Sequence, residues 1–299
     1  MRTWARRAEA QAGVPEGEGA AGEGLFVPPG HYHSPIVCWE EVEADARSVF
    51  GRHPLEVPGV DLRLDEQLAL LEELAKYSDE LCFPKAPTPG HRYYYENGGY
   101  SYGDAIFLYA MLRHLRPRRL VEVGSGYSSA ATLDTNERFL DFEVRCTFVD
   151  PSPGLLRSLL KPGDLERVEV VEARVQDVDL GLFAQLDWND VLFVDSSHVS
   201  KTGSDVNFLV FEVLPRLRPG VVVHFHDVFA GFEYPREWVR QGRSWNEAYL
   251  LRAFLQYNRC FRVLLHNNLL WHLRPEVVEG SFPLVAENPG ASLWIERVD

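Results

Sequence analysis

Short apolar runs alternate with helix-length segments from residue 118 to the end of the chain. The runs rich in Val, Leu and Phe predict strands over 120–123, 144–149, 168–171, 191–194, 221–225 and 261–265. Helices are predicted between them, over 128–139, 152–160, 180–186, 205–217 and 246–257. Strands that alternate with helices form a parallel sheet with helices on both faces. The sequence therefore predicts a doubly wound α/β fold.

One more strand is predicted at 291–297, after the turn at Pro289-Gly290. No helix is expected between this strand and the preceding one. A strand reached without a crossover helix is antiparallel to its neighbour. The predicted sheet is therefore seven-stranded and mostly parallel.

The chain before residue 102 is predicted to be an N-terminal extension. Residues 1–24 are rich in Gly, Ala and Glu and are expected to be flexible. Residues 25–101 read as an accessory layer of loops and two helices, over 40–50 and 64–78. Within it, the proline-rich segment 25–36 is either an arm packed on the core or a lid over a pocket. Residues 102–299 form the predicted ligand-binding domain, which begins with a helix to residue 115 behind a Ser101–Asp104 capping box.

Composition narrows the classes of partner. Lys and Arg number 30 against 44 Asp and Glu, so the formal net charge is −14, which argues against nucleic acid. No apolar run reaches the roughly 18 residues that span a bilayer, and no hydrophobic core follows the N-terminal arginines as in a secretory signal. The four cysteines lack metal-ligand spacing. We expect a cytoplasmic protein with a small-molecule substrate and no nucleic-acid or membrane partner.

A tight turn follows the predicted strand 120–123. Gly124 and Gly126, on either side of Ser125, let backbone N–H groups approach a ligand because they carry no Cβ. The helix that begins next offers free N–H groups and a partial positive charge. Glu122 lies at the carboxyl end of the strand, where open α/β sheets bind ligands. An acid there suits a hydroxyl or amino group better than a phosphate.

Polar residues also follow the next three strands. Asp150 and Pro151 close the second strand, and an acid there can accept both hydroxyls of a ribose. Gln176 and Asp177 follow the third strand, in a polar cluster suited to an adenine edge. Asp195 ends the fourth strand. These residues are predicted to surround one nucleoside-like ligand.

These pieces resemble the class I S-adenosylmethionine-dependent methyltransferases. The matching pieces are Glu122 to Ser129, Asp150, Gln176-Asp177, Asp195 and Arg218 to Asp227. The resemblance covers roughly residues 102–270 and the final strand, and it implies a Rossmann-like sheet that binds S-adenosylmethionine. The sequence Gly126-Tyr127-Ser128 is more similar to the small-molecule O-methyltransferases of the catechol and caffeoyl-CoA type, and this resemblance implies a hydroxyl acceptor.

The resemblance also implies roles for single residues. Gly124 and Gly126 would contact the methionine portion, Asp150 the ribose and Asp177 the adenine region. Ser128 stands where the third small residue of the loop is usually Gly. A dehydrogenase would instead show G-x-G-x-x-G and an earlier acid than Asp150. The predicted cofactor-binding set is Glu122, Gly124, Ser125, Gly126, Ser128, Asp150, Pro151, Gln176, Asp177 and Asp195.

A second group follows the fourth and fifth strands: Asp195, His198, His226 and Asp227. Neighbouring parallel strands lie about 4.8 Å apart, so these side chains can share one pocket. All four together could hold a divalent ion, Mg, Mn, Fe or Zn. Alternatively His226, with Asp195 and His198, forms a metal-free catalytic base. A third interpretation is structural, in which Asp195 only orients the cofactor amine and His226 is a hydrogen-bonded core residue.

The resemblance bears on this choice. In the metal-dependent O-methyltransferases, acids at these strand ends bind a divalent ion that lowers the pKa of a substrate hydroxyl. This chain has His226-Asp227 where Asp-Asn is usual, which disfavours Mg in particular.

The segment 229–246, with residues 31–33 and 93–95, is aromatic and could wall a substrate site or form a homo-oligomer interface. We expect methyl transfer to a small molecule. The alternatives are a metal-dependent enzyme of another kind and a non-catalytic cofactor-binding protein on the same fold.

Overall fold

The computed structural model describes residues 25–299, and the predicted flexible segment 1–24 lies outside the described residues. The described residues form two compact units, residues 25–52 with 235–244 and residues 53–234 with 245–299. The predicted boundary at residue 101 does not coincide with this division. Residues 53–101 belong to the same unit as the sheet, because α4 (Leu64–Ala75) packs against β6 and α5.

The first unit contains three short helices, α2 (Trp39–Ala44), α3 (Ala46–Phe50) and α10 (Arg236–Arg240). The single helix predicted over 40–50 is divided at Asp45, whose backbone (φ −110°, ψ 18°) departs from helical geometry. An ion pair between Arg236 and Glu43 joins α10 to α2. The packed arm and the lid, which are the two alternatives for residues 25–36, stay predictions.

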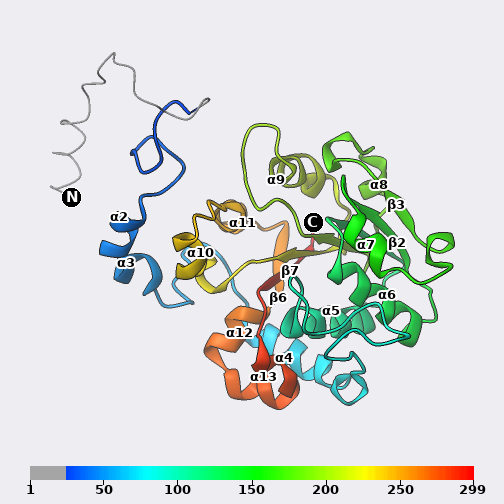
Figure 1. The fold of residues 1–299 in the computed structure, drawn as a ribbon. Coiled ribbons are helices and arrows are strands. Elements are labelled where there is room, and N and C mark those ends of the chain that lie inside the picture. The colour runs from blue at the N-terminus through cyan, green and yellow to red at the C-terminus, as the bar shows by residue number, and fades with distance from the viewer. Residues whose placement is uncertain (1–24) are drawn as a thin grey trace. The chain divides into compact units, whose positions relative to one another are not determined.

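The second unit is built on a seven-stranded sheet in the order β3-β2-β1-β4-β5-β7-β6 (Figure 1). The strands are β1 (Arg119–Val123), β2 (Arg145–Val149), β3 (Glu169–Val171), β4 (Val191–Val194), β5 (Val222–His226), β6 (Phe261–His266) and β7 (Ser292–Arg297). β7 is antiparallel to both of its neighbours, and the other pairs are parallel. The predicted α/β class and the antiparallel last strand are confirmed.

The reason predicted for the antiparallel strand is wrong. Two helices, α12 (Asn267–Leu273) and α13 (Pro275–Ser281), lie between β6 and β7. Both pack against α4 at one side of the unit (Figure 1). They turn the chain so that β7 enters between β5 and β6 from the opposite direction.

The remaining helices follow the predicted order. They are α5 (Tyr102–Leu115), α6 (Tyr127–Phe139), α7 (Gly154–Leu159), α8 (Gly181–Ala184), α9 (Asp205–Phe208) and α11 (Glu247–Leu255). Short 3-10 turns lie at 78–80, 164–166, 175–177, 230–232 and 283–287. The helix predicted over 205–217 changes type after α9, to a π-helix (Leu209–Val213) and a 3-10 turn (Leu214–Arg216). Pro215 has no N–H to continue an α-helical ladder.

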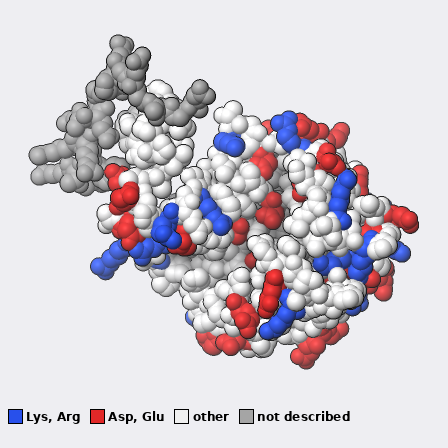
Figure 2. Space-filling view, viewed as in Figure 1, with Lys and Arg blue, Asp and Glu red and all other residues white. Residues whose placement is uncertain are grey.

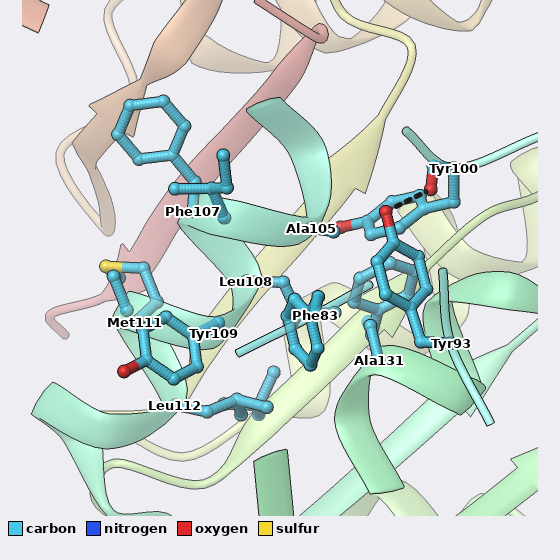
Figure 3. Close-up of a cluster of buried hydrophobic side chains, with 14 of the residues drawn as sticks. Phe83, Tyr93, Tyr100, Ala105, Phe107, Leu108, Tyr109, Met111, Leu112 and Ala131 are labelled. Atoms are coloured by element: carbon cyan, nitrogen blue, oxygen red, sulfur yellow. Dashed lines mark hydrogen bonds between the residues drawn. The ribbon is translucent and has the colours of Figure 1, made fainter. Parts of the chain in front are cut away.

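Two hydrophobic clusters fill the two faces of the sheet. α5 is the centre of one cluster, because every residue from Tyr102 to Leu112 is buried. Figure 3 shows Phe107, Leu108 and Met111 of this helix among the side chains of that cluster. A helix that is apolar all round belongs inside a core. None of the helices within residues 25–299 is long and apolar enough to cross a membrane.

The predicted capping box at the start of α5 is wrong. Ser101 Oγ donates to the carbonyl oxygen of Tyr95 (3.0 Å) instead of accepting from the helix. Asp104 Oδ1 accepts from the backbone N–H of Ala291 (2.9 Å), at the entry to β7. Asp104 therefore joins two distant segments rather than capping its own helix.

Candidate functional site

A cleft of about 460 Å³ opens where β1, β2 and β4 end. Gly124, Pro151, Gln176 and Asp195 of the predicted cofactor set line it. Lys201, Ser204 and Asp205, where α9 begins, line it as well. Ligands bind at the carboxyl ends of strands in open α/β sheets. These four predicted residues thus come from the segments after β1, β2, β3 and β4 to one cleft. The other predicted residues are not among those that line it: Glu122, Ser125, Gly126, Ser128, Asp150 and Asp177.

Gly124 occupies a position that only glycine can take. Its φ is +83°, and its N–H donates to the carbonyl oxygen of Val149 (3.0 Å). A Cβ at this position would lie 2.1 Å from the carbonyl oxygen of Asp195. The bare backbone therefore lets the ends of β1, β2 and β4 meet at the cleft.

Asp150 is hydrogen-bonded to the turn Gly124-Ser125-Gly126, which we call the glycine loop. Its Oδ2 accepts from the N–H (3.0 Å) and Oγ (2.7 Å) of Ser125, and its Oδ1 accepts from the N–H of Ser152 (2.7 Å). Three of the roughly four lone-pair directions of the carboxylate are thus used, and the one left for a ligand hydroxyl is on Oδ1. The ribose role predicted for Asp150 is therefore compatible with this geometry.

Glu122 is fully buried and does not line the cleft. Its Oε1 accepts from the hydroxyls of Ser128 (2.5 Å) and Ser129 (2.9 Å), which fastens the start of α6 to β1. Burial raises the pKa of Glu122 to about 8, although the two serine hydrogen bonds lower it. Oε2 is buried without a hydrogen-bond partner among the described residues.

The structure separates the two residues predicted beside adenine. Gln176 lines the cleft, and its Nε2 donates to the carbonyl oxygen of Gly203 (2.9 Å). Asp177 is exposed and forms a bidentate ion pair with Arg174 (2.8 and 2.9 Å). Arg174 lines the cleft and Asp177 does not. This favours Gln176 and Arg174 as the residues nearest a base, and the role of Asp177 stays a prediction.

Imidazoles and carboxylates alternate at the ends of β4 and β5. His226 lies between Asp195 (Nδ1 to Oδ1, 3.2 Å) and Asp104 (Nε2 to Oδ2, 3.5 Å). His198 lies between Asp195 and Glu247. Its Nε2 is 3.4 Å from the same Oδ1 of Asp195, and its Nδ1 is 2.9 Å from Oε2 of Glu247. We call the series Asp104–His226–Asp195–His198–Glu247 the acid–imidazole chain. It brings together the residues predicted from β4 and β5.

Asp227 lies beside this chain. Its Oδ2 is 3.7 Å from His198 Nε2 and 3.7 Å from His226 Nδ1. Asp227 and His198 both adopt left-handed backbone conformations, with φ of 57° and 59°. Non-glycine residues hold such conformations only where the surroundings enforce them, and they cluster at functional sites.

Comparison with known proteins identifies the family. Residues 121–228 match the model of a family described as a methyltransferase domain. The matched range begins in β1 and ends just after β5, so it contains the glycine loop, Asp150, Asp195 and His226. Residues 121–228 therefore form a methyltransferase domain. The predicted methyltransferase is thereby confirmed.

Relatives of this methyltransferase include an uncharacterised protein of Archaeoglobus fulgidus, 35% identical over 187 residues, which are 60% of this chain and 83% of the relative. A solved structure of a Podospora anserina methyltransferase with bound S-adenosylhomocysteine is 17% identical, over 87% of this chain and 95% of that one, with a TM-score of 0.42. An O-methyltransferase of Streptomyces achromogenes involved in tomaymycin synthesis, in complex with S-adenosylmethionine, is 16% identical over 87% and 97%, with a TM-score of 0.42.

The histidines of the methyltransferase are held as cations. Burial alone would lower the pKa of His198, but hydrogen bonds and charges from Asp195 and Glu247 raise it to about 10. Burial likewise opposes the charge on His226, but Asp227, Asp195 and Asp104 raise its pKa well above the ordinary value. Near neutral pH both rings are donors at both nitrogens. Neither is a free proton acceptor, which departs from the role predicted for His226.

The carboxylates respond in opposite directions. Burial would raise the pKa of Asp195, but the charges and hydrogen bonds of His226 and His198 lower it. Burial raises the pKa of Asp227, although the same two histidines lower it. Asp195 is therefore ionised, and its side chain retains 32% exposure at the cleft.

The predicted metal set does not fit a metal ion in this arrangement. Across residues 25–299, no group of three or more His, Cys, Asp and Glu side chains is placed to hold one. A histidine ligand must present an unprotonated nitrogen, whereas every ring nitrogen of His198 and His226 faces a carboxylate. The methyltransferase arranges these four residues as ion pairs.

Sequence reasoning missed Asp104 and Glu247. Both are buried acids, 6% and 2% exposed. Each stands in the first turn of a helix, where acids are common because they offset the helix dipole. The only signal against that interpretation was the apolar sequence around them.

Of the aromatic segments predicted to wall a substrate site, residues 93–95 and 229–246 differ in where their side chains lie. Tyr93 and Tyr95 are buried in the core beside Phe83, and Tyr93 donates to the carbonyl oxygen of Tyr100 (Figure 3). Trp245 covers His198, with ring centroids 4.3 Å apart. Tyr234 packs against Trp245 at 6.1 Å. Trp245 is therefore the aromatic group of that stretch nearest to the acid–imidazole chain.

Proposed function

We propose that this methyltransferase methylates a hydroxyl group of a small-molecule acceptor, and that the acid–imidazole chain assists loss of the hydroxyl proton without a metal ion. The observation that carries the proposal is the position of Asp195. It lines the cleft while both histidines contact a single one of its oxygens. Asp195 is thus an oriented, ionised acceptor beside the cofactor loop.

Methyl transfer divides the work between cofactor and protein. S-adenosylmethionine supplies a methyl group on a positively charged sulfur, which leaves as a neutral thioether and needs no proton. The protein must align the acceptor oxygen with the methyl carbon and exclude water. It must also take the proton that the hydroxyl loses as its oxygen bonds to carbon. Asp195 would receive that proton late, once the acceptor oxygen has bonded to the methyl carbon and become strongly acidic, because His198 and His226 lower the pKa of Asp195 and make it a weak base.

Figure 2 shows acidic and basic side chains interspersed over one face of the molecule. No run of basic residues dominates the coloured part of that face. A small acceptor fits this surface better than a polyanion does, since phosphate neutralisation needs clustered Lys and Arg.

Replacing Asp150 by Ala should weaken the binding of S-adenosylmethionine about 10- to 100-fold, because a charged acceptor of hydroxyl hydrogen bonds contributes about 1.5–3 kcal/mol. Isothermal titration calorimetry measures the change. Ser125→Ala is the matched control, since it removes one contact to Asp150 and leaves the carboxylate in place. Wild-type affinity in the Asp150 variant would remove that residue from the ribose site.

Replacing His226 by Gln should lower turnover about 100-fold or more, as expected for a group that supports proton transfer. The affinity for S-adenosylmethionine should change by less than about threefold, because the loop at Gly124 and Asp150 is untouched. Turnover is measured with labelled cofactor and a panel of small phenols and alcohols. His272→Gln is the control, because His272 bonds to a helix carbonyl of Asn268 (2.8 Å) and is not part of the acid–imidazole chain.

The same assay decides whether the acid–imidazole chain or a metal ion assists loss of the hydroxyl proton. Wild-type protein stripped with EDTA should keep full turnover. Loss of turnover that returns on adding Mg, Mn, Fe or Zn would contradict the metal-free proposal and support the metal site predicted from the sequence.

A further inference from the structure

Glu247 is a buried acid whose carboxylate contacts the loop that follows β4. It is 2% exposed, and acids are rarely buried unless they are paired. Its Oε1 accepts from Ser196 Oγ (2.9 Å), and its Oε2 lies 2.9 Å from His198 Nδ1. Both oxygens therefore bond to residues within three positions of Asp195.

The start of α11 holds His198 in other ways as well. The backbone N–H groups of Asn246 (3.0 Å) and Glu247 (3.1 Å) both donate to the carbonyl oxygen of His198. The ring of Trp245 covers its imidazole at 4.3 Å. These contacts enforce the left-handed backbone of His198, which a residue with a side chain seldom adopts. Backbone, ring and carboxylate thus fix one histidine.

That histidine in turn determines which oxygen of Asp195 faces a ligand. His198 Nε2 contacts Oδ1 of Asp195, and His226 Nδ1 contacts the same atom from β5. Oδ2 is then the oxygen that remains for a ligand in the cleft. A rotated His198 would release one of the two contacts that hold Asp195 in this orientation.

We infer that Glu247 is a positioning residue, which acts through His198 to orient the carboxylate of Asp195 toward the methyl acceptor. Asp104 has the equivalent place behind His226 at the other end of the acid–imidazole chain. The inference rests on the proposed function, in which Asp195 receives the hydroxyl proton. It assigns a role in the reaction to a residue that lies outside the cleft.

The test is Glu247→Gln in the full chain, which keeps the size of the side chain and removes its charge. We expect kcat with the best acceptor of the panel to fall about 10- to 100-fold, the range for a supporting residue that misplaces a reacting group. KM for S-adenosylmethionine and the calorimetric affinity for S-adenosylhomocysteine should stay within about threefold of wild type, because the glycine loop does not depend on Glu247. Glu247→Asp, which keeps the charge and shortens the side chain, replaces the glutamine variant if that variant does not fold, and the same split is expected.

Glu296→Gln is the matched control. Glu296 is also a buried acid, and it forms an ion pair with Arg262. It lies opposite Val222, the first residue of β5, and so at the other end of the strands from the cleft. Its loss should lower thermal stability without changing kcat.

The outcomes separate this inference from the proposed function. Wild-type kcat in both Glu247 variants would overturn the inference while leaving methyl transfer in place. A parallel loss of kcat and cofactor affinity would also overturn it, because that result indicates general damage to the fold. Absence of methyl transfer by the wild-type protein would instead overturn the proposed function, and the inference with it.

Discussion

Gly124→Ala is expected to reduce the affinity for S-adenosylmethionine more than 100-fold. The new Cβ would lie 2.1 Å from the carbonyl oxygen of Asp195, and that neighbour is backbone rather than a side chain that could move aside. The residue would also have to keep a φ of +83°, which costs a residue with a side chain about 1–2 kcal/mol. The ends of β1 and β4 must separate, and this distorts both the cofactor loop and the position of Asp195. Calorimetry with S-adenosylmethionine measures the loss.

Gly154→Ala is the control for this variant. Gly154 begins α7, close along the chain to the cleft residue Pro151, and an added Cβ would meet nothing within 4 Å. Alanine favours a helix by up to about 1 kcal/mol over glycine. Affinity should be unchanged and stability equal or higher. If Gly124→Ala bound the cofactor as tightly as Gly154→Ala, the glycine loop could not be the binding element.

Arg92→Met is expected to lower the free energy of unfolding by about 3–5 kcal/mol, the usual cost of removing one partner from a buried ion pair. The guanidinium of Arg92 is 1% exposed and forms a bidentate pair with Asp164, with Nε at 2.7 Å from Oδ2. Its Nη1 donates to Asp134 Oδ1 (2.8 Å) and to Glu137. Methionine fills similar space but leaves two buried carboxylates without this partner. Urea denaturation measures the change.

Arg157→Met is the matched control, because the pair between Arg157 and Glu172 (2.6 Å) lies on the surface, with both side chains 55% exposed. Exposed pairs contribute about 0–1 kcal/mol. An equal, small loss in both variants would show that the buried ion pairs of Arg92 do not stabilise the fold. A large loss confined to Arg92→Met is the expected result.

The strands were predictable because of where they lie. Strands of a parallel sheet are covered on both faces, so they read as continuous apolar runs. For this reason β4 begins and ends at the predicted residues, and β1 and β2 start within one residue of the prediction. The cluster of Asp195, His198, His226 and Asp227 was predictable for a related reason, since parallel strands present their carboxyl ends at one edge.

The acids behind the histidines could not be predicted in this way. Asp104 reaches His226 from a helix 122 positions earlier in the chain, and Glu247 reaches His198 from a helix 49 positions later. Nothing local distinguishes either from an ordinary acid in a first helical turn. Tyr93 and Tyr95 are an error of the opposite kind. Their aromatic sequence next to a loop suggested the wall of a substrate pocket, but both side chains are buried in the hydrophobic core.

The sequence by itself determined the α/β class, the order of strands and helices, and the glycine loop with Asp150 beside it. These features depend on periodicity and on residues adjacent along the chain. Only the tertiary structure decided the protonation and pairing of the histidines, the mismatch with a metal site, and the part played by Asp104 and Glu247. Those properties depend on burial and on distances between groups far apart in sequence, because a buried charge is stable only beside the partner that the fold brings to it.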